Sequence, residues 1–177
     1  LDEIAKAKAE IINNIFPSGV MIINKDDKYY NYFLSKAKTR NLNIITFSKK
    51  NKLADVVYLS ERKNKNQFLC KFLIKGKIKF FLIPNYLINF KENILSTLSI
   101  IINYFNIDAL PINLFSNFKI SQSRGSIIKY KKGKKNLTIT DESYNSNPLS
   151  FKFALERFDK TYKDSKKKFI LIGNMLE

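Results

Sequence analysis

Residues 138–148 read TITDESYNSNP, and this stretch decides how the C-terminal part of the chain folds. The residues leading into it alternate between polar and apolar side chains, which is typical of a β-strand. Carboxylates, hydroxyls and amides follow, and the stretch ends in Asn147 and Pro148, which suit the N-cap and the first position of a helix. We therefore predict a strand that ends in a polar turn and leads directly into a helix.

The helix predicted after Pro148 is amphipathic, because its apolar side chains recur at helical spacing on one face: Phe151, Ala154, Leu155, Phe158 and Tyr162. Residues 169–172 then form a short continuous apolar run before Gly173, which is typical of a buried parallel strand. The segment is thus predicted to be a β-α-β unit. Its polar turn lies where open α/β sheets bind ligands.

The residues upstream predict further helices and strands from their periodicity. Helices are predicted at 1–15, 28–38 and 91–105, strands at 20–23, 44–47 and 56–59, and hairpins around Gly76 and Gly133. In the first hairpin, apolar residues alternate on both strands: Phe68, Cys70, Phe72 and Ile74 on one, and Ile78, Phe80 and Leu82 on the other. In the first helix, Lys8 falls near the centre of an apolar arc that four isoleucines form: Ile4, Ile11, Ile12 and Ile15.

Composition excludes several classes of protein. The net charge is +17, but only four of the 32 basic residues are arginine, whereas a dedicated nucleic-acid reader uses arginine for bidentate contacts. We therefore expect no specific nucleic-acid partner. No apolar run approaches the ~18 residues of a membrane-spanning helix, so no membrane span is expected. The single Cys70 excludes an intramolecular disulfide, and the absence of histidine excludes histidine chemistry.

Two motifs resemble those of a known family. DESYNSNP at 141–148 and GNMLE at 173–177 are similar to the DDSYNANP and GDMLE motifs of the Mur ligases, which are ATP-dependent amide-forming enzymes. Two residues depart from the family pattern. Glu142 keeps the charge of the family's aspartate on a longer arm, whereas Asn174 loses a carboxylate.

The resemblance implies an α/β fold in two parts. Residues 1–140 would be the second half of a Mur ligase central ATP-binding domain, which is a mixed sheet with helices and β-hairpins. Residues 141–177 would begin a Rossmann-like C-terminal domain with its first β-α-β. The residues contain no Gly-x-x-x-x-Gly-Lys-Ser/Thr phosphate-binding loop, so we expect a partial chain that is inactive as a ligase by itself.

Within the family, the Ser-Tyr-Asn-Ser-Asn-Pro run resembles the member that adds a dipeptide. That resemblance implies the substrates UDP-MurNAc-tripeptide and D-Ala-D-Ala, the cofactors ATP and Mg²⁺, and a cytoplasmic monomer that makes peptidoglycan precursors. ATP would phosphorylate the tripeptide carboxylate to an acyl phosphate, which the dipeptide amine would attack.

The resemblance also implies roles for residues in the first part of the chain. Lys8 falls on a lysine that is carbamylated in several Mur ligases, so the carbamate is a predicted Mg²⁺ ligand with a catalytic role. The alternative is a lysine that snorkels to water. Asn93 matches an asparagine that frames adenine, although Glu92 and Ser96 replace the family's neighbouring histidine and second asparagine.

Further roles fall on the second part. Arg124, before Gly125, is predicted to reach the nucleotide phosphates and to offset charge during phosphoryl transfer, as a catalytic and a nucleotide-binding residue. Asp141 or Glu142 would bind ribose. Three neighbours would line an interdomain cleft near ATP: Ser143, Tyr144 and Asn145.

Three other interpretations stay open at this point. A sister amide ligase, either another Mur enzyme or folylpolyglutamate synthase, would share the chemistry. A basic nucleic-acid-binding module would rest on charge alone. A non-catalytic remnant would explain the substitutions at Glu92, Ser96 and Asn174.

Overall fold

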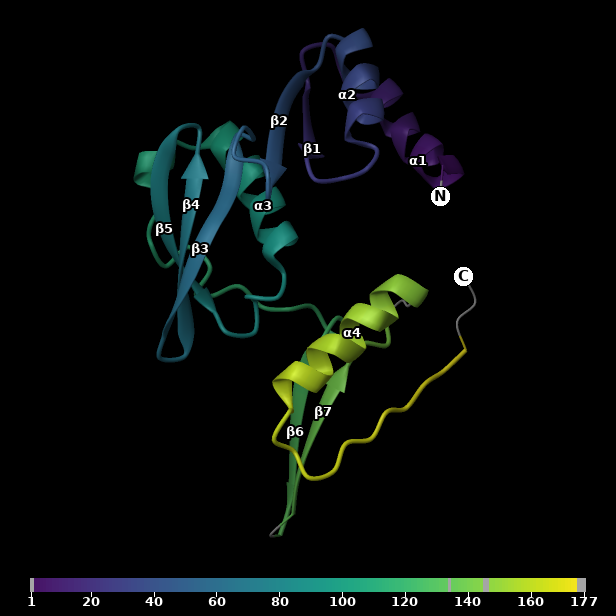
Figure 1. Cartoon of the computed structure of the whole chain (residues 1–177), viewed down its shortest axis with the longest axis vertical. Helices are drawn as coiled ribbons and strands as arrows, with labels where there is room; N and C mark the ends of the chain where they lie inside the picture. Colours follow the sequence, from purple (N-terminus) through teal and green to yellow (C-terminus); the bar gives the residue numbers. More distant parts are fainter. Residues whose placement is uncertain (1, 134, 145–146, 175–177) are drawn as a thin grey trace. The chain divides into compact units, whose positions relative to one another are not determined.

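The computed structural model describes residues 2–133, 135–144 and 147–174. The chain forms two compact units, Leu1–Asn117 and Phe118–Glu177, and each is described by itself. Unit 1 is an α/β domain, as predicted, and unit 2 is a β-hairpin followed by a helix (Figure 1). The predicted domain boundary after residue 140 stays a prediction; the junction between the compact units lies upstream of it.

Unit 1 is built on a five-stranded mixed sheet in the order β1-β2-β3-β4-β5 (Figure 1). Its strands are β1 (Val20–Asn24), β2 (Asn43–Ser48), β3 (Val56–Asn64), β4 (Gln67–Ile74) and β5 (Lys77–Pro84). The first three strands run parallel, whereas β3, β4 and β5 pair antiparallel. The strands predicted at 20–23, 44–47 and 56–59 and the hairpin around Gly76 are formed. A register shift between Tyr58 and Ser60 interrupts the antiparallel pairing of β3 with β4.

Helices cover both faces of the parallel strands. They are α1 (Asp2–Ala9), which continues as the 3₁₀ turn η1 (Glu10–Asn14), α2 (Tyr30–Thr39) and α3 (Lys91–Tyr104). The short η2 (Ile107–Ala109) follows α3, and its Asp108 pairs with Lys77 and Lys79 of β5. Met21 and Ile44 pair in register and pack against a cluster from α1, η1, α2 and the turn before β2: Ala9, Ile12, Ala37 and Leu42. Side chains alternate along a strand, so the buried Ile45 faces the other way, where α3 contacts β1, β2 and β3.

The apolar face of α3 forms the rest of this core. Ile94, Leu95, Leu98 and Ile102 are all buried, at the i, i+4 and i+8 spacing that the sequence predicted. Each such side chain contributes about 2 kcal/mol when it is fully removed from water. The helix is therefore fixed along its length against the parallel strands, and its first turn lies near their carboxyl ends.

The turn of the first hairpin corrects one prediction. Two residues, Lys75 and Gly76, connect the strands with positive φ values of 46° and 80°, which is a type I′ arrangement. That turn pairs Ile74 with Lys77, and hence Cys70 with Phe81. The buried face of β5 is therefore made of Phe81 and Ile83. Three alternating residues were predicted on this strand: Ile78, Phe80 and Leu82. Ile78 and Phe80 are both 45% exposed, and Leu82 is half-buried.

The first helix also differs from its prediction. Its buried face consists of Ala5, Ala9 and Ile12, whereas Ile4 and Ile11 are mostly exposed. Ala9 and Ile12 belong to the buried cluster that also contains Ala37 of α2, and this packing decides which face is buried. Lys8 is therefore exposed and does not lie in the centre of an apolar arc.

Unit 2 contains the strand, turn and helix predicted around residues 138–148. The strands β6 (Ser126–Lys132) and β7 (Lys135–Asp141) form an antiparallel hairpin, and α4 (Pro148–Thr161) follows. The Asn147 side chain accepts a hydrogen bond from the Ser150 amide at 2.9 Å, and the Ser150 hydroxyl accepts one from the Asn147 amide at 3.0 Å. This capping box, with proline at the first position, confirms the predicted helix start.

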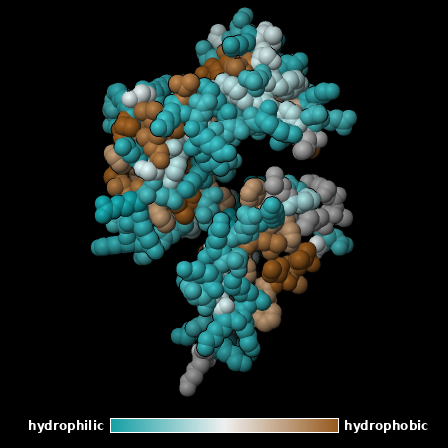
Figure 2. All heavy atoms as spheres, viewed as in Figure 1, coloured by the Kyte–Doolittle hydropathy of each residue, from teal (hydrophilic) through white to brown (hydrophobic). Residues whose placement is uncertain are grey.

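The buried strand predicted at 169–172 is not formed. These residues pair with no strand of the described chain, and Leu171 is fully exposed. They appear as a brown patch along the segment that Figure 1 draws in yellow (Figure 2). A parallel strand needs a neighbour to take its hydrogen bonds, and β6 and β7 pair only with each other. The predicted β-α-β unit is thus present as strand, turn and helix alone.

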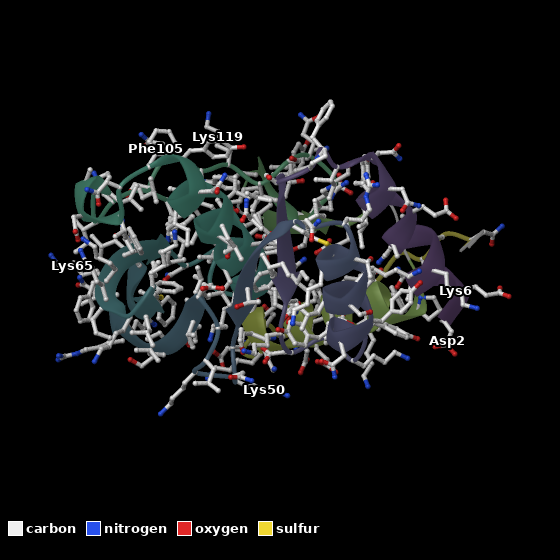
Figure 3. All side chains as sticks on the ribbon, turned by 90° about the horizontal axis from the view of Figure 1, so that it is seen from above. Asp2, Lys6, Lys50, Lys65, Phe105 and Lys119 are labelled. Atoms are coloured by element: carbon white, nitrogen blue, oxygen red, sulfur yellow. The ribbon has the colours of Figure 1, made fainter. Side chains whose placement is uncertain are left out.

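The surface carries the excess of basic residues. Lys6, Lys50, Lys65 and Lys119 are exposed and point outward (Figure 3). Among the described residues, no helix has both the length and the apolar character needed to cross a membrane.

Candidate functional site

Two segments of unit 2 are joined into one corner, which we call the polar corner: residues 123–125, before β6, and 141–144, at the end of β7. The Gly125 amide donates to the Asp141 carbonyl at 2.7 Å, and the Tyr144 amide donates to the Ser123 carbonyl at 3.0 Å. The Ser123 hydroxyl donates to the Asp141 carboxylate at 3.0 Å. The hairpin therefore closes at its base, where its two ends bring Arg124 beside the acidic turn.

Asp141 is the carboxylate that is most fully hydrogen-bonded in this corner. The Ser143 amide donates to its Oδ1 at 3.0 Å, while Ser123 donates to Oδ2. Hydrogen bonds from Ser143, with a further one from Ser123, hold the pKa of Asp141 below its ordinary value of 3.8. Asp141 is therefore an ionised acceptor at neutral pH, which suits the hydroxyls of a ribose.

Arg124 and Tyr144 lie against each other at the open side of the polar corner. The guanidinium carbon of Arg124 is 4.1 Å from the centroid of the Tyr144 ring. Both side chains are exposed, so the stacked guanidinium keeps its donors available to an anion. Of the residues predicted to bind nucleotide, the structure brings together Arg124 and four from the acidic turn: Asp141, Glu142, Ser143 and Tyr144. Asn145 lies outside the described residues.

Glu142 has a different partner, which the sequence did not suggest. Its carboxylate forms an ion pair with Arg157 of α4, and the two side chains are 34% and 22% exposed. The only signal was the position of Arg157 beside the apolar face of the predicted helix. A charge at that place needs a partner from another element, and the sequence alone does not say which.

The first turn of α3 carries Asn93, which is exposed. Two ion pairs fix this turn to the sheet. Lys49, after β2, lies 2.5 Å from Glu92, and Lys91 lies 2.8 Å from Glu61 of β3. Asn93 is therefore held near the carboxyl ends of the parallel strands, which is where α/β folds bind ligands. Lys49 was not predicted to take part in any contact.

The same edge of the sheet carries a network around Asp26, after β1. The Ser48 hydroxyl donates to Asp26 at 2.5 Å, and the Lys49 amide donates to it at 2.6 Å. The Ser48 oxygen accepts in turn from the amide of Asn51 at 2.6 Å. These bonds fix the loops after β1 and β2, so they position the loop that bears Lys49 against α3.

Lys8 lies on α1 of unit 1, on its exposed side. A carbamate there would be reachable by solvent CO2 and by a metal ion. Over residues 2–133, 135–144 and 147–174, no group of three or more acidic, cysteine or histidine residues is placed to hold a metal. These residues by themselves do not fit a Mg²⁺ site.

The described residues form an α/β domain with polar side chains at the carboxyl ends of its parallel strands, followed by a separate hairpin-helix unit. The family is shown by the match of residues 1–101 to the Mur ligase middle domain. The chain belongs to the Mur ligase family.

Two relatives match along the whole chain and carry the same name, UDP-N-acetylmuramoyl-tripeptide–D-alanyl-D-alanine ligase. The protein of Rickettsia prowazekii is 29% identical over 178 residues, which cover 100% of this chain and 38% of the relative. The protein of Bacillus subtilis is 31% identical over 180 residues, which cover 98% of this chain and 35% of the relative. The chain therefore spans just over a third of the length of these ligases.

Solved structures share the fold. MurF from Acinetobacter baumannii superposes with a TM-score of 0.69 at 20% identity, covering 88% of this chain and 32% of that one. MurF ligase from Thermotoga maritima, solved in complex with ADP, superposes with a TM-score of 0.63 at 21% identity, covering 88% of this chain and 34% of that one. The α/β fold with its mixed sheet and hairpin is thus part of a Mur ligase fold.

Proposed function

We propose that this chain is part of an ATP-dependent ligase that joins D-Ala-D-Ala to UDP-MurNAc-tripeptide during cytoplasmic synthesis of peptidoglycan precursors. The observation that carries the proposal is the match along 100% and 98% of the chain to two ligases named for this reaction. The polar corner supports it, since it holds the exposed guanidinium of Arg124 beside the acidic turn, and such groups can bind the phosphates and the ribose of a nucleotide.

The proposed reaction has two steps. The γ-phosphoryl group of ATP passes to the terminal carboxylate of the tripeptide, which gives ADP and an acyl phosphate. The amine of the dipeptide then attacks the acyl carbon and loses a proton, and phosphate leaves with the electron pair of the broken C–O bond. Catalysis of such transfers is mostly positioning and charge stabilisation. Arg124, stacked on Tyr144, would offset the charge on the transferred phosphoryl group.

The nucleotide contacts fall on both units. Asn93 would frame adenine, and Asp141 or Glu142 would bind ribose. The remaining residues of the acidic turn would line the cleft near ATP: Ser143, Tyr144 and Asn145.

Mg²⁺ is the second cofactor of the proposed enzyme, and it would offset the charge of the phosphates. Lys8 would bind it as a carbamate, in a catalytic role. The described residues contain no acidic cluster that could complete such a site, so we derive no step through the metal ion. The role of Lys8 would be tested by rescue of a Lys8→Ala ligase with an added short carboxylic acid, whose carboxylate would replace that of the carbamate.

We further propose that residues 1–140 belong to the central ATP-binding domain and that 141–177 begin the C-terminal domain with its first β-α-β. The chain spans only 38% and 35% of the two ligases. For this reason we expect the 177-residue chain alone to show no ligase turnover.

The test uses the longer protein that contains this chain. ATP, UDP-MurNAc-tripeptide and D-Ala-D-Ala are supplied, phosphate release is followed, and the amide product is identified by mass. Arg124→Ala is expected to lower kcat by about 100-fold, as loss of a charge-stabilising donor does. Arg62→Ala is the matched control, because Arg62 is an exposed residue of β3 outside the predicted site.

Two outcomes would overturn the proposal. Phosphate release that needs neither peptide substrate would mean that the protein is not this ligase. Turnover with a single amino acid in place of the dipeptide would assign a sister reaction of the family.

A further inference from the structure

The helices of unit 1 cover the two faces of its sheet unequally. α3 contacts β1, β2 and β3 on one face, whereas α2 contacts only β1 and β2 on the other, where Ile44 packs against its cluster. Ser48 lies on the same face as Ile44, and it pairs with Val57 of β3. Val57 pairs with Leu73 of β4, which pairs in turn with Ile78 of β5. The face that α2 covers therefore continues over the antiparallel strands.

The side chains on this continuation are mostly apolar. We call it the outer face, and on β4 and β5 it consists of three directly opposed pairs: Leu73 with Ile78, Lys71 with Phe80, and Leu69 with Leu82. Ile78 and Phe80 are 45% exposed, and the other four side chains are half-buried. Hydrophobic side chains gather in brown over β4 and β5 in Figure 2. Contiguous exposed apolar side chains, unlike scattered ones, mark an interaction site.

The outer face carries no carboxylate. Residues 56–84, which form the three antiparallel strands and their turns, contain seven basic residues and a single acidic one, Glu61. Glu61 pairs in register with the buried Cys70, so it lies on the opposite face of the sheet. There its carboxylate lies 2.8 Å from the amine of Lys91 of α3. The one negative charge of these strands is thus placed on the α3 side.

Basic side chains lie within and around the apolar pairs. Lys71 belongs to the outer face, and Arg62 of β3 lies on it opposite Leu69. Lys65 and Lys75 occupy the turns at the two ends of β4, and both are exposed (Figure 3). The outer face is therefore an apolar surface with cations inside it and at both ends. Its complement is a surface that is negative outside and apolar beneath.

We propose that the outer face binds the surface of an anionic lipid bilayer. Its apolar side chains enter the boundary between head groups and acyl chains, and its basic side chains meet the head-group phosphates. Lys71 suits this position, because the stem of a lysine can lie along apolar surface while its amine stays in the polar layer. The protein then lies on the membrane without spanning it.

Charge and hydrophobicity together favour this partner over two others. A second copy of the chain, packed face to face, would bring the cations Arg62 and Lys71 of both copies together, and like charges disfavour such a contact. A nucleic acid would attract these cations through its phosphates, but it would leave the apolar pairs in water. A bilayer surface offers a partner to both kinds of side chain.

The test measures how the longer protein that contains this chain sediments with sucrose-loaded vesicles. One set of vesicles is phosphatidylcholine alone, and in the other about a third of the lipid is phosphatidylglycerol, which gives a negative surface. Wild-type protein should bind the anionic vesicles at least about tenfold more strongly. Raising the ionic strength should weaken this binding, since salt screens charges near the surface.

Variants of the outer face separate its apolar and its basic contribution. Phe80→Thr and Ile78→Thr should each lower the partition coefficient by about five- to tenfold at low and at high salt, because they remove apolar surface. Lys71→Gln should lower it about fivefold at low salt and much less at high salt. Ile100→Thr and Lys119→Gln are the controls and should bind as wild type. Ile100 is 49% exposed on α3, and Lys119 is exposed in unit 2.

The variants should remain folded, because the substituted side chains are partly exposed and threonine suits a strand, and circular dichroism checks this. Absence of binding to anionic vesicles, or equal binding by wild type and Phe80→Thr, would overturn the inference. So would a dimer that Phe80→Thr dissociates. Equal losses in Lys71→Gln and Lys119→Gln would assign the attraction to the net charge of +17 and not to this face. Vesicle binding needs no ligase turnover, so failure of the proposed function would leave this result unchanged.

Discussion

The guanidinium of Arg124 stacks on the ring of Tyr144, 4.1 Å from its centroid. Arg124 precedes β6 and Tyr144 follows β7, so the whole hairpin separates them in the sequence. The hairpin brings them together because its base is closed by backbone hydrogen bonds between 123–125 and 141–144. The ring supports the cation from one side and leaves its edge open. An anion would therefore meet a guanidinium whose orientation is already fixed, which lowers the entropy lost on binding.

Removing the Tyr144 ring should weaken ATP binding modestly. An exposed cation–π contact contributes about 0.5–1 kcal/mol, so Tyr144→Ala in the longer ligase should raise KM for ATP by roughly two- to fivefold. Tyr144→Phe keeps the ring and should remain near wild type. Steady-state kinetics at varied ATP measures both. An equal loss in the two variants would mean that the hydroxyl, and not the ring, is what matters.

Gly125 and Gly133 offer a matched pair of glycines. Gly125 has a φ of +92° and its added Cβ would force the Arg157 guanidinium away from Glu142, whereas Gly133 has a φ of +57° and open space around it. We expect Gly133→Ala to cost about 1 kcal/mol from backbone strain alone, and Gly125→Ala to cost at least about 2 kcal/mol. Hydrogen exchange of the β6 and β7 amides measures both. Equal costs would argue against an ion pair at this position.

Local rules predicted much of this fold correctly. The start of α4 follows from Asn147 and Pro148, which act on backbone groups within one turn, and the capping box is present. The strands of the sheet and α3 follow from hydrophobic periodicity over many residues. Such signals are contained in short segments, so they can be interpreted without knowledge of the rest of the chain.

The wrong predictions concern features that tertiary contacts decide, such as which face of a helix or strand is buried. A helical wheel of residues 1–15 ranks the isoleucines above the alanines, but the buried face consists of Ala5, Ala9 and Ile12, and Lys8 faces solvent. The buried face of β5 depends on the length of one turn, and a change of register by one residue moves every side chain to the other face. The apolar run at 169–172 has no neighbouring strand in the described chain.

The sequence likewise indicated some residues of the candidate site and missed others. The resemblance indicated Arg124 and the acidic turn, and the structure places them together. It gave no sign of Arg157, because an ion pair between a turn and a helix 15 positions further along leaves no periodic trace. The ribose contact and the carbamate on Lys8 stay predictions.

Asp141 should give unit 2 a stability that depends on pH. Its folded pKa lies below the ordinary value of 3.8, because Ser143 and Ser123 donate to the ionised form. That contribution is fully present above 3.8 and is lost as the pH falls through the lower, folded value. Asp141→Asn should therefore flatten the acid limb of the unfolding curve, followed by circular dichroism. Asp164→Asn is the control, an exposed carboxylate for which we expect no change. An unaltered acid limb in Asp141→Asn would contradict the hydrogen bonds described above.

Cys70 should report on the core of unit 1. Its side chain is fully buried in β4, and burial, assisted by the charge of Glu61, raises the pKa of the thiol to about 12. Because only the thiolate reacts, a disulfide reagent at mildly alkaline pH should label the native chain slowly and the urea-unfolded chain quickly.

Two substitutions on opposite faces of the hairpin sharpen this test. Phe72 is buried between Tyr58 and Phe81, with ring centroids 5.6 Å and 5.8 Å away, so Phe72→Ala should cost about 3–5 kcal/mol and speed labelling of Cys70. Phe80 is 45% exposed on the other face, and Phe80→Ala should leave the rate close to that of wild type. Faster labelling in Phe80→Ala than in Phe72→Ala would mean that the hairpin register is the one expected from alternation alone, with Phe80 inside the core.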